Sequence, residues 1–126
     1  MNNDLISIII PVYNCRDYLK RCLDSVFSQD YKNYEVICID DGSIDDSAQI
    51  AKEYDVRYYY QENSGQAVAR NKGIELSKGE WLCFVDSDDS IEPDYLSKMY
   101  EATSDNVDIV VCRIKRINED SSYNVD

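Results

Sequence analysis

Hydrophobic and polar positions alternate along the chain in two patterns. Continuous apolar, β-branched runs are typical of strands buried on both faces, whereas apolar stripes spaced by three or four residues are typical of amphipathic helices. The runs predict strands at 5–10, 34–39, 56–60, 80–85 and 107–114. The stripes predict helices at about 14–27, 45–54, 64–77 and from 93 onward. Because strand and helix alternate, the pattern predicts an α/β fold with a mostly parallel sheet and helices on both faces.

Single residues set the expected boundaries of these elements. Pro11 lacks a backbone N–H, so we expect it to end the first strand. Asn14 and Ser64 are the expected N-caps of the first and third helices. Gly79 is the expected stop of the third helix. The short aromatic run at 56–60 is expected near an edge of the sheet.

Length and charge narrow the class of protein. The 126 residues fit one compact domain, which we expect over 1–117, followed by a polar tail at 118–126. Thirteen Lys and Arg against twenty-five Asp and Glu give a formal charge of −12, which disfavours nucleic acid and anionic membranes as direct partners. No apolar run approaches the roughly 20 residues of a membrane span, and residues 1–4 lack the positive start of a signal peptide. We therefore expect a cytoplasmic protein.

Cysteine and histidine usage limits the chemistry. The five cysteines form no CxxC pair, and most lie in apolar runs, where a thiol behaves as a small hydrophobic group. The chain contains no histidine. Any general acid, general base or metal ligand is therefore expected among the carboxylates.

Four polar clusters follow the predicted strands. In an open parallel sheet, ligands bind outside the carboxyl ends of the strands, and all four clusters are expected there. Each cluster alone would also suit a turn or a helix cap. Their shared placement favours a binding site; the clusters are PVYN at 11–14, DDGS at 40–43, ENSG at 62–65 and DSDD at 86–89.

The last cluster indicates a cation. Asp86, Asp88 and Asp89 would raise one another's pKa unless a cation neutralised them. Oxygen ligands favour Mg²⁺ or Mn²⁺, whose coordination shell is commonly completed by water and substrate phosphate. The cluster therefore predicts a phosphorylated ligand. A calcium loop is a weaker alternative, because glycine comes too early in the sequence Asp40-Asp41-Gly42.

Two further features suit a nucleotide. The helix start at Ser64 and Gly65 would direct its positive dipole end toward a phosphate, and Arg70 follows in the same helix. Arg70 could equally be a surface charge. Tyr13 could stack on a planar base or pack in the core.

The chain resembles family 2 glycosyltransferases of the GT-A fold over almost all of 7–96. The segments that carry the resemblance are SIIIPVYN at 7–14, CLDSVFSQ at 22–29, IDDGSIDDS at 39–47, ENSGQAVARNKGI at 62–74 and GEWLCFVDSDDSIEPDYL at 79–96. The resemblance implies a metal-dependent, inverting enzyme of polysaccharide biosynthesis. Such an enzyme transfers a sugar from a nucleotide diphosphate, most often a UDP-sugar, to a hydroxyl of a saccharide or lipid-linked acceptor. A lipid-linked acceptor would bring the protein to a membrane surface.

The resemblance also implies roles for single residues. The nucleoside pocket would be lined by Pro11, Val12 and Tyr13, with Tyr13 against the base. Asp41 would accept the base N–H, with Asp40 beside it. The diphosphate side would be closed by Asn63, Gly65 and Arg70. Asp86-Ser87-Asp88 would be the family's DxD motif, with Asp88 on the metal and with Asp86 or Asp89 on ribose, sugar or metal.

The chain departs from the family after this motif. The family takes its general base from an acceptor-binding half, and none of the acids that follow Asp89 matches that base motif. We therefore expect the chain to supply the donor and metal site without the general base. One alternative is a nucleotide-sugar-binding fragment without catalysis. A less favoured alternative is a phosphatase with Asp86 as nucleophile and Asp88 as acid, a class that needs a lysine and further acids downstream.

Overall fold

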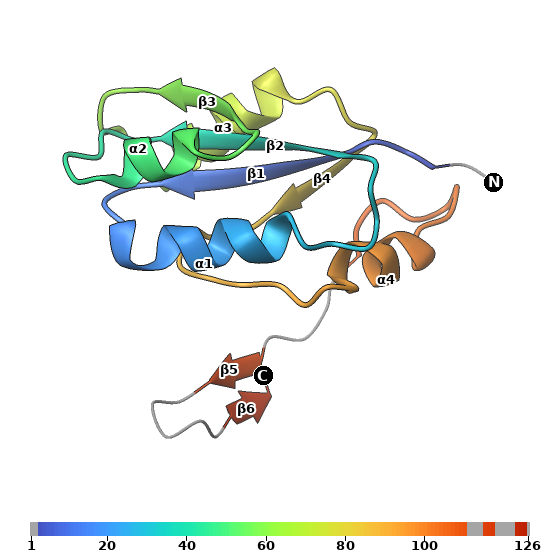
Figure 1. The fold of residues 1–126 in the computed structure, drawn as a ribbon. Helices are drawn as coiled ribbons and strands as arrows, with labels where there is room; N and C mark the ends of the chain where they lie inside the picture. Colours follow the sequence, from blue (N-terminus) through green and yellow to red (C-terminus); the bar gives the residue numbers. More distant parts are fainter. Residues whose placement is uncertain (1–2, 111–114, 118–122, 126) are drawn as a thin grey trace.

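The computed structural model describes residues 3–110, 115–117 and 123–125. Four parallel strands form a sheet in the order β3-β2-β1-β4 (Figure 1). The strands are β1 (Ile6–Val12), β2 (Tyr34–Asp40), β3 (Arg57–Tyr60) and β4 (Trp81–Phe84). The helices are α1 (Arg16–Val26), α2 (Ser47–Lys52), α3 (Gln66–Leu76) and α4 (Tyr95–Glu101). The predicted α/β class and parallel sheet are confirmed.

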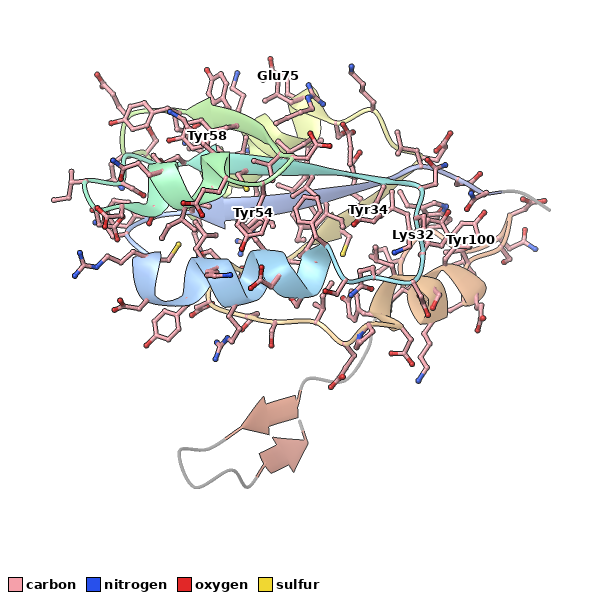
Figure 2. All side chains as sticks on the ribbon, viewed as in Figure 1. Lys32, Tyr34, Tyr54, Tyr58, Glu75 and Tyr100 are labelled. Atoms are coloured by element: carbon pink, nitrogen blue, oxygen red, sulfur yellow. The ribbon has the colours of Figure 1, made fainter. Side chains whose placement is uncertain are left out.

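Helices cover both faces of this sheet, as the alternating pattern predicts. On one face, Ile8 and Ile10 of β1 pack with Leu19 and Leu23 of α1 in the larger hydrophobic core. On the opposite face, side chains of β2 pack against Ala69 of α3. Figure 1 shows α1 and α3 on opposite sides of the strands. The aromatic rings of Tyr34 and Tyr54, labelled in Figure 2, close the α1 side by packing against Phe27.

The prediction that Pro11 ends the first strand is wrong, because β1 pairs with β2 as far as Val12 and Asp40. The N–H and C=O groups of one residue point to the same side of a strand, and successive residues point to opposite sides. The carbonyl of Ile9 accepts from Val85 on the β4 side, and the carbonyl of Val12 accepts from Asp41 on the β2 side. The nitrogen of Pro11 therefore faces the β4 side, where β4 has already ended at Phe84, and the ladder loses no hydrogen bond.

Both predicted N-caps are wrong. Helix α1 is preceded by Cys15, while Asn14 has a positive φ of 47° and accepts the Ile44 N–H through Oδ1 at 2.8 Å. Helix α3 is preceded by Gly65, whose φ of 102° favours glycine. Ser64 instead donates its backbone N–H to Asp41. The capping group of Asn14 is thus used by the distant Ile44, whereas the Ser64 hydroxyl donates locally to the carbonyl of Glu62.

Gly79 does not stop the third helix, which ends at Leu76. A Cβ at Gly79 would lie 2.7 Å from the Leu5 carbonyl oxygen and from the Ser7 nitrogen. A glycine is therefore needed here because the turn into β4 passes directly against the start of β1.

The predicted strand at 107–114 is not present in its described part. Residues 107–110 contain no strand, and the Val107 N–H closes a turn to the carbonyl of Ser104. Residues 111–114 lie outside the described residues. An antiparallel pair, β5 (Lys115–Ile117) and β6 (Tyr123–Val125), follows, so that β6 falls within the segment expected as a polar tail.

β3 forms one edge of the four-stranded sheet, as expected from its short aromatic run. None of the described helices is both long and apolar enough to cross a membrane.

Candidate functional site

A cleft of about 460 Å³ opens at the carboxyl ends of the strands. All four polar clusters contribute lining residues, the DDGS cluster through Asp41 alone. The lining residues come from the ends of β1, β2 and β4, from the loop after β3 and from α1 and α3: Pro11, Val12, Tyr13, Asn14, Cys15, Tyr18, Asp41, Asn63, Gly65, Gln66, Ala69, Asp86, Ser87 and Asp88. The structure thus brings together most of the predicted site residues.

The acidic turn after β4 forms one wall of the cleft. Carboxylate oxygens of Asp86, Asp88 and Asp89 lie within 4.8 Å of one another. Burial raises the pKa of Asp89, and the neighbouring charges of Asp88 and Asp86 raise it further. A crowded set of carboxylates fits Mg²⁺ or Mn²⁺, which would relieve the repulsion.

Arg70 reaches the same turn from α3. Its Nη2 lies 3.1 Å from Oδ1 of Asp86, whose side chain is 47% exposed. The Arg70 guanidinium therefore lies beside the acidic turn and does not project freely from the surface. It neutralises Asp86 and leaves Asp88 and Asp89 as the less compensated carboxylates of the turn.

Asp41 is 5% exposed at the floor of the cleft and accepts hydrogen bonds on both carboxylate oxygens. Oδ1 accepts from Gln61 Nε2 at 2.9 Å and from the Ser64 N–H at 2.7 Å. Oδ2 accepts from the Gly65 N–H at 2.9 Å and from Asn63 Nδ2 at 3.2 Å. Burial opposes ionisation of Asp41, but the bonds from Gln61, Ser64 and Gly65 outweigh it and hold the pKa below its usual value. Asp41 thus fixes the loop before α3 as a charged carboxylate.

Asp40 does not reach the cleft. Its side chain is fully buried, where Oδ1 accepts the Ser43 N–H at 2.8 Å and Oδ2 accepts the Tyr58 hydroxyl at 2.5 Å. Burial raises the pKa of Tyr58, and the Asp40 carboxylate raises it further. Asp40 and Tyr58 therefore form a structural pair beneath β3, and of the two acids only Asp41 lines the cleft.

The expected nucleoside and diphosphate residues occupy different parts of the cleft. Pro11 and Val12 are buried in its wall, and Tyr13 is 52% exposed at its mouth, which favours stacking over core packing. Asn63 and Gly65 also line the cleft, but their N–H groups already contact Asp41.

Tyr18 is the clearest lining residue that the sequence reasoning missed. It counts with the apolar stripe of the first helix in the sequence, yet its ring is 50% exposed at the cleft and lies 5.6 Å from the Arg21 guanidinium carbon. The buried positions of α1 are Leu19, Cys22, Leu23 and Val26. Tyr18 lies at the border of that stripe, and this border position was the available signal.

Known proteins are similar in sequence to this chain over almost its whole length. The model of Glycosyl transferase family 2 matches residues 7–125. The chain belongs to this family. Glycosyltransferase GlyA of Streptococcus pneumoniae is 42% identical over 123 residues, which cover 93% of this chain and 18% of GlyA. The chain spans between 18% and 41% of the length of the curated relatives it matches.

Solved structures of glycosyltransferases share the fold. S. aureus TarS in complex with UDP-GlcNAc matches with a TM-score of 0.70 and 33% identity, covering 76% of this family 2 chain and 30% of TarS. The mannosyltransferase PcManGT from Pyrobaculum calidifontis, in complex with GDP-Man and Mn²⁺, matches with a TM-score of 0.74 and 23% identity, covering 84% of this chain and 34% of PcManGT. The predicted GT-A fold is therefore confirmed.

Proposed function

We propose that this chain forms the donor- and metal-binding part of an inverting glycosyltransferase that uses a UDP-sugar. The observation that carries the proposal is the cleft itself, which has Asp86 and Asp88 of the three-carboxylate turn along one wall and an exposed tyrosine at its mouth. The 33% identity to TarS, a protein solved with UDP-GlcNAc, supports a uridine nucleotide. The fold shared with PcManGT, solved with Mn²⁺, is consistent with a cation at this end of the sheet.

The acidic turn would hold Mn²⁺ or Mg²⁺ through Asp88, together with Asp86 or Asp89. The cation would supply electrostatic stabilisation of the leaving diphosphate. Arg70 keeps Asp86 in place at the cleft wall. The start of α3 opens on the cleft through Gly65 and Gln66, so the positive end of the helix dipole would favour the diphosphate.

The nucleoside would lie between Tyr13 and Asp41. Tyr13 would stack on the base, and the buried Pro11 and Val12 would form the wall behind it. The N3–H of uracil would donate to Asp41, whose oxygens already accept four donors. Because Gln61 is a side-chain donor on a half-buried residue, its amide is the group that would make room on Oδ1.

We place the general base outside the described carboxylates of the cleft. Asp41 is held by four donors, Asp86 by Arg70, and Asp88 and Asp89 would face the cation. In the transfer step, the acceptor oxygen would bond to the anomeric carbon, the diphosphate would leave with the bonding electrons, and the acceptor proton would pass to that base. The acceptor, a saccharide or a lipid-linked hydroxyl, is part of this proposal.

Metal-linked nucleotide binding tests the proposal. We expect UDP to bind at least about tenfold more tightly with Mn²⁺ than with EDTA, because uncompensated carboxylates repel a diphosphate. Asp88→Asn should remove most of this difference. The matched control is Asp105→Asn, which removes one charge from an exposed residue that does not line the cleft. Equal UDP affinity with Mn²⁺ and with EDTA, measured by calorimetry on the wild-type chain, would contradict the proposal.

A further inference from the structure

Helix α1 presents a row of polar side chains to the segment that follows β4. Arg21 and Cys22 contact the acidic turn, and Ser25 and Gln29 contact the chain beyond it. Arg21 and Ser25, four residues apart, lie on one side of α1 with Cys22 between them, and Gln29 follows just beyond the helix, which ends at Val26. The side chains of the first helix and of the residues just after it therefore hold the backbone of 86–96, more than 60 residues away in sequence.

The far half of this row consists of the half-buried Ser25 and the buried Gln29. Gln29 is fully buried, donates to the Glu92 carbonyl at 2.7 Å and accepts the Leu96 N–H at 2.9 Å. Ser25 accepts the Ile91 N–H through Oγ at 3.1 Å. These contacts fix the path of the segment, because a buried amide that loses its hydrogen-bond partner costs folding free energy.

The near half holds the acidic turn itself. Arg21 donates from Nη2 to the backbone carbonyl of Asp88 at 2.8 Å, and the Cys22 thiol lies 3.6 Å from the carbonyl of Asp86. The Arg21 guanidinium also lies over the ring of Tyr18, which lines the cleft. Arg21 is exposed, so this charge-assisted bond orders a side chain that solvent would otherwise leave free.

We propose that Arg21 is a positioning residue of the cation site, an inference that rests on the proposed function. Three carboxylates within 4.8 Å repel one another and push the turn open. The bond to the Asp88 carbonyl holds the turn closed against that repulsion, so the carboxylates are already gathered when a cation arrives. Arg21 thus acts through the backbone of Asp88, without touching cation or nucleotide.

Arg21 also carries a positive charge beside the acidic turn, and this effect has the opposite sign. A nearby cation lowers the affinity of carboxylates for a second cation by Coulomb repulsion. If Arg21 acted by charge alone, its removal would tighten Mn²⁺ binding. If it positions the turn, its removal weakens Mn²⁺ binding. The direction of change separates the two roles.

The experiment titrates the wild-type chain and its variants with Mn²⁺ alone and follows free Mn²⁺ by electron paramagnetic resonance. We expect Arg21→Met to weaken Mn²⁺ binding about tenfold, the lower end of the usual loss when a group that orients metal ligands is removed. Lys20→Met is the matched control, because the neighbouring Lys20 pairs with Asp24 on the helix surface and carries the same charge. The control should stay within about twofold of wild type.

Thermal unfolding of each variant accompanies the titration, and we expect similar midpoints because Arg21 is exposed. Should Arg21→Met fail to fold, Arg21→Lys keeps the charge and must still bind Mn²⁺ more weakly than wild type. Unchanged or tighter Mn²⁺ binding by the Arg21 variants, an equal loss in Lys20→Met, or no Mn²⁺ binding by the wild type would each overturn the inference. The proposed function is judged separately, by UDP binding with Mn²⁺ against EDTA.

Discussion

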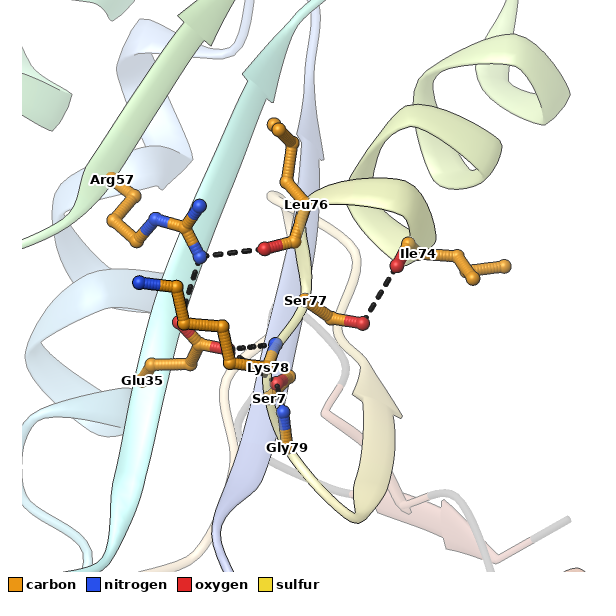
Figure 3. A network of polar contacts seen from close by, with 8 residues as sticks. All are labelled: Ser7, Glu35, Arg57, Ile74, Leu76, Ser77, Lys78 and Gly79. Atoms are coloured by element: carbon orange, nitrogen blue, oxygen red, sulfur yellow. Dashed lines mark hydrogen bonds and ion pairs between the residues drawn. The ribbon is translucent and has the colours of Figure 1, made fainter.

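The two ends of the sheet are each organised around a carboxylate of similar behaviour and different surroundings. At the amino end, Glu35 accepts the Ser7 hydroxyl at 2.6 Å, the Lys78 N–H at 2.7 Å and Arg57 Nη1 at 2.9 Å (Figure 3). At the carboxyl end, Asp41 accepts from the loop before α3. Burial opposes ionisation of Glu35, yet bonds from Ser7, Lys78 and Arg57 outweigh it, so its pKa is lowered like that of Asp41.

The difference lies in the compensation of charge. Glu35 forms an ion pair with Arg57. The same Nη1 of Arg57 also donates to the carbonyl of Leu76 at 2.7 Å. Among the described residues, the donors to Asp41 are all neutral amides, and three further carboxylates line the acidic turn nearby. The amino end is thus balanced within the protein. The carboxyl end keeps negative charge that a cation-bound ligand would relieve.

The sharpest way to break this comparison is to neutralise each carboxylate in turn. Asp41→Asn places an amide where four donors converge, so we expect UDP affinity with Mn²⁺ to fall about thirtyfold or more, by the roughly 2 kcal/mol cost of unmatched buried groups. Glu35→Gln should lower the free energy of unfolding by about 2 kcal/mol and leave UDP affinity within about twofold. Calorimetry and urea unfolding measure the two quantities. An equal loss of UDP affinity in both variants would show that the ends are not specialised.

A finer test asks whether the carboxyl end recognises the base. UDP should bind about tenfold more tightly than CDP, because cytosine offers an unprotonated ring nitrogen where Asp41 needs a donor. Asp41→Ala should abolish the preference. Glu35→Gln is the matched control and should retain it. Competition calorimetry with UDP and CDP on the three proteins gives the ratio, and a preference that survives in Asp41→Ala would remove Asp41 from base recognition.

The smallest effect we expect is a difference in salt response under acid. Both pKa values lie below those of the unfolded chain, so each carboxylate stabilises the fold above the usual range near pH 4. That contribution is lost as the pH falls through the folded pKa. Salt should reduce the Glu35 contribution, which includes the Arg57 ion pair, more than the Asp41 contribution. Urea unfolding between pH 5.5 and pH 3 at low and high NaCl, for wild type, Glu35→Gln and Asp41→Asn, checks this; identical salt responses would contradict it.

The strands could be predicted because their signal is local. The β-branched runs of β1 and β2 specify buried strands, and strand ends in a parallel sheet share one edge, so the position of the cleft followed from order alone. Which acid faces the cleft did not follow. Asp40 lies on the same face of β2 as Cys38, beneath Tyr58, and the depth of that cover depends on β3.

Contacts between distant segments account for the remaining errors. Asn14 is a good cap by composition, yet its Oδ1 accepts the N–H of Ile44; the loop that contains Ser64 is held by Asp41, which leaves Gly65 as the residue before α3. The role of Arg21 could not be predicted from the sequence, because its partner is the backbone carbonyl of Asp88, and every residue has a carbonyl. Such pairings depend on the packing of α1 against the turn after β4, which periodicity does not specify.

Asp41 and Glu35 also help to hold the two ends of α3 against the sheet. The helix begins beside an amide that Asp41 holds and ends at the Leu76 carbonyl, which Arg57 and Glu35 hold. It is an eleven-residue strut pinned at both ends to the strand beneath it. The loop at the cleft and the turn before β4 are therefore connected through a single helix as well as through the strands.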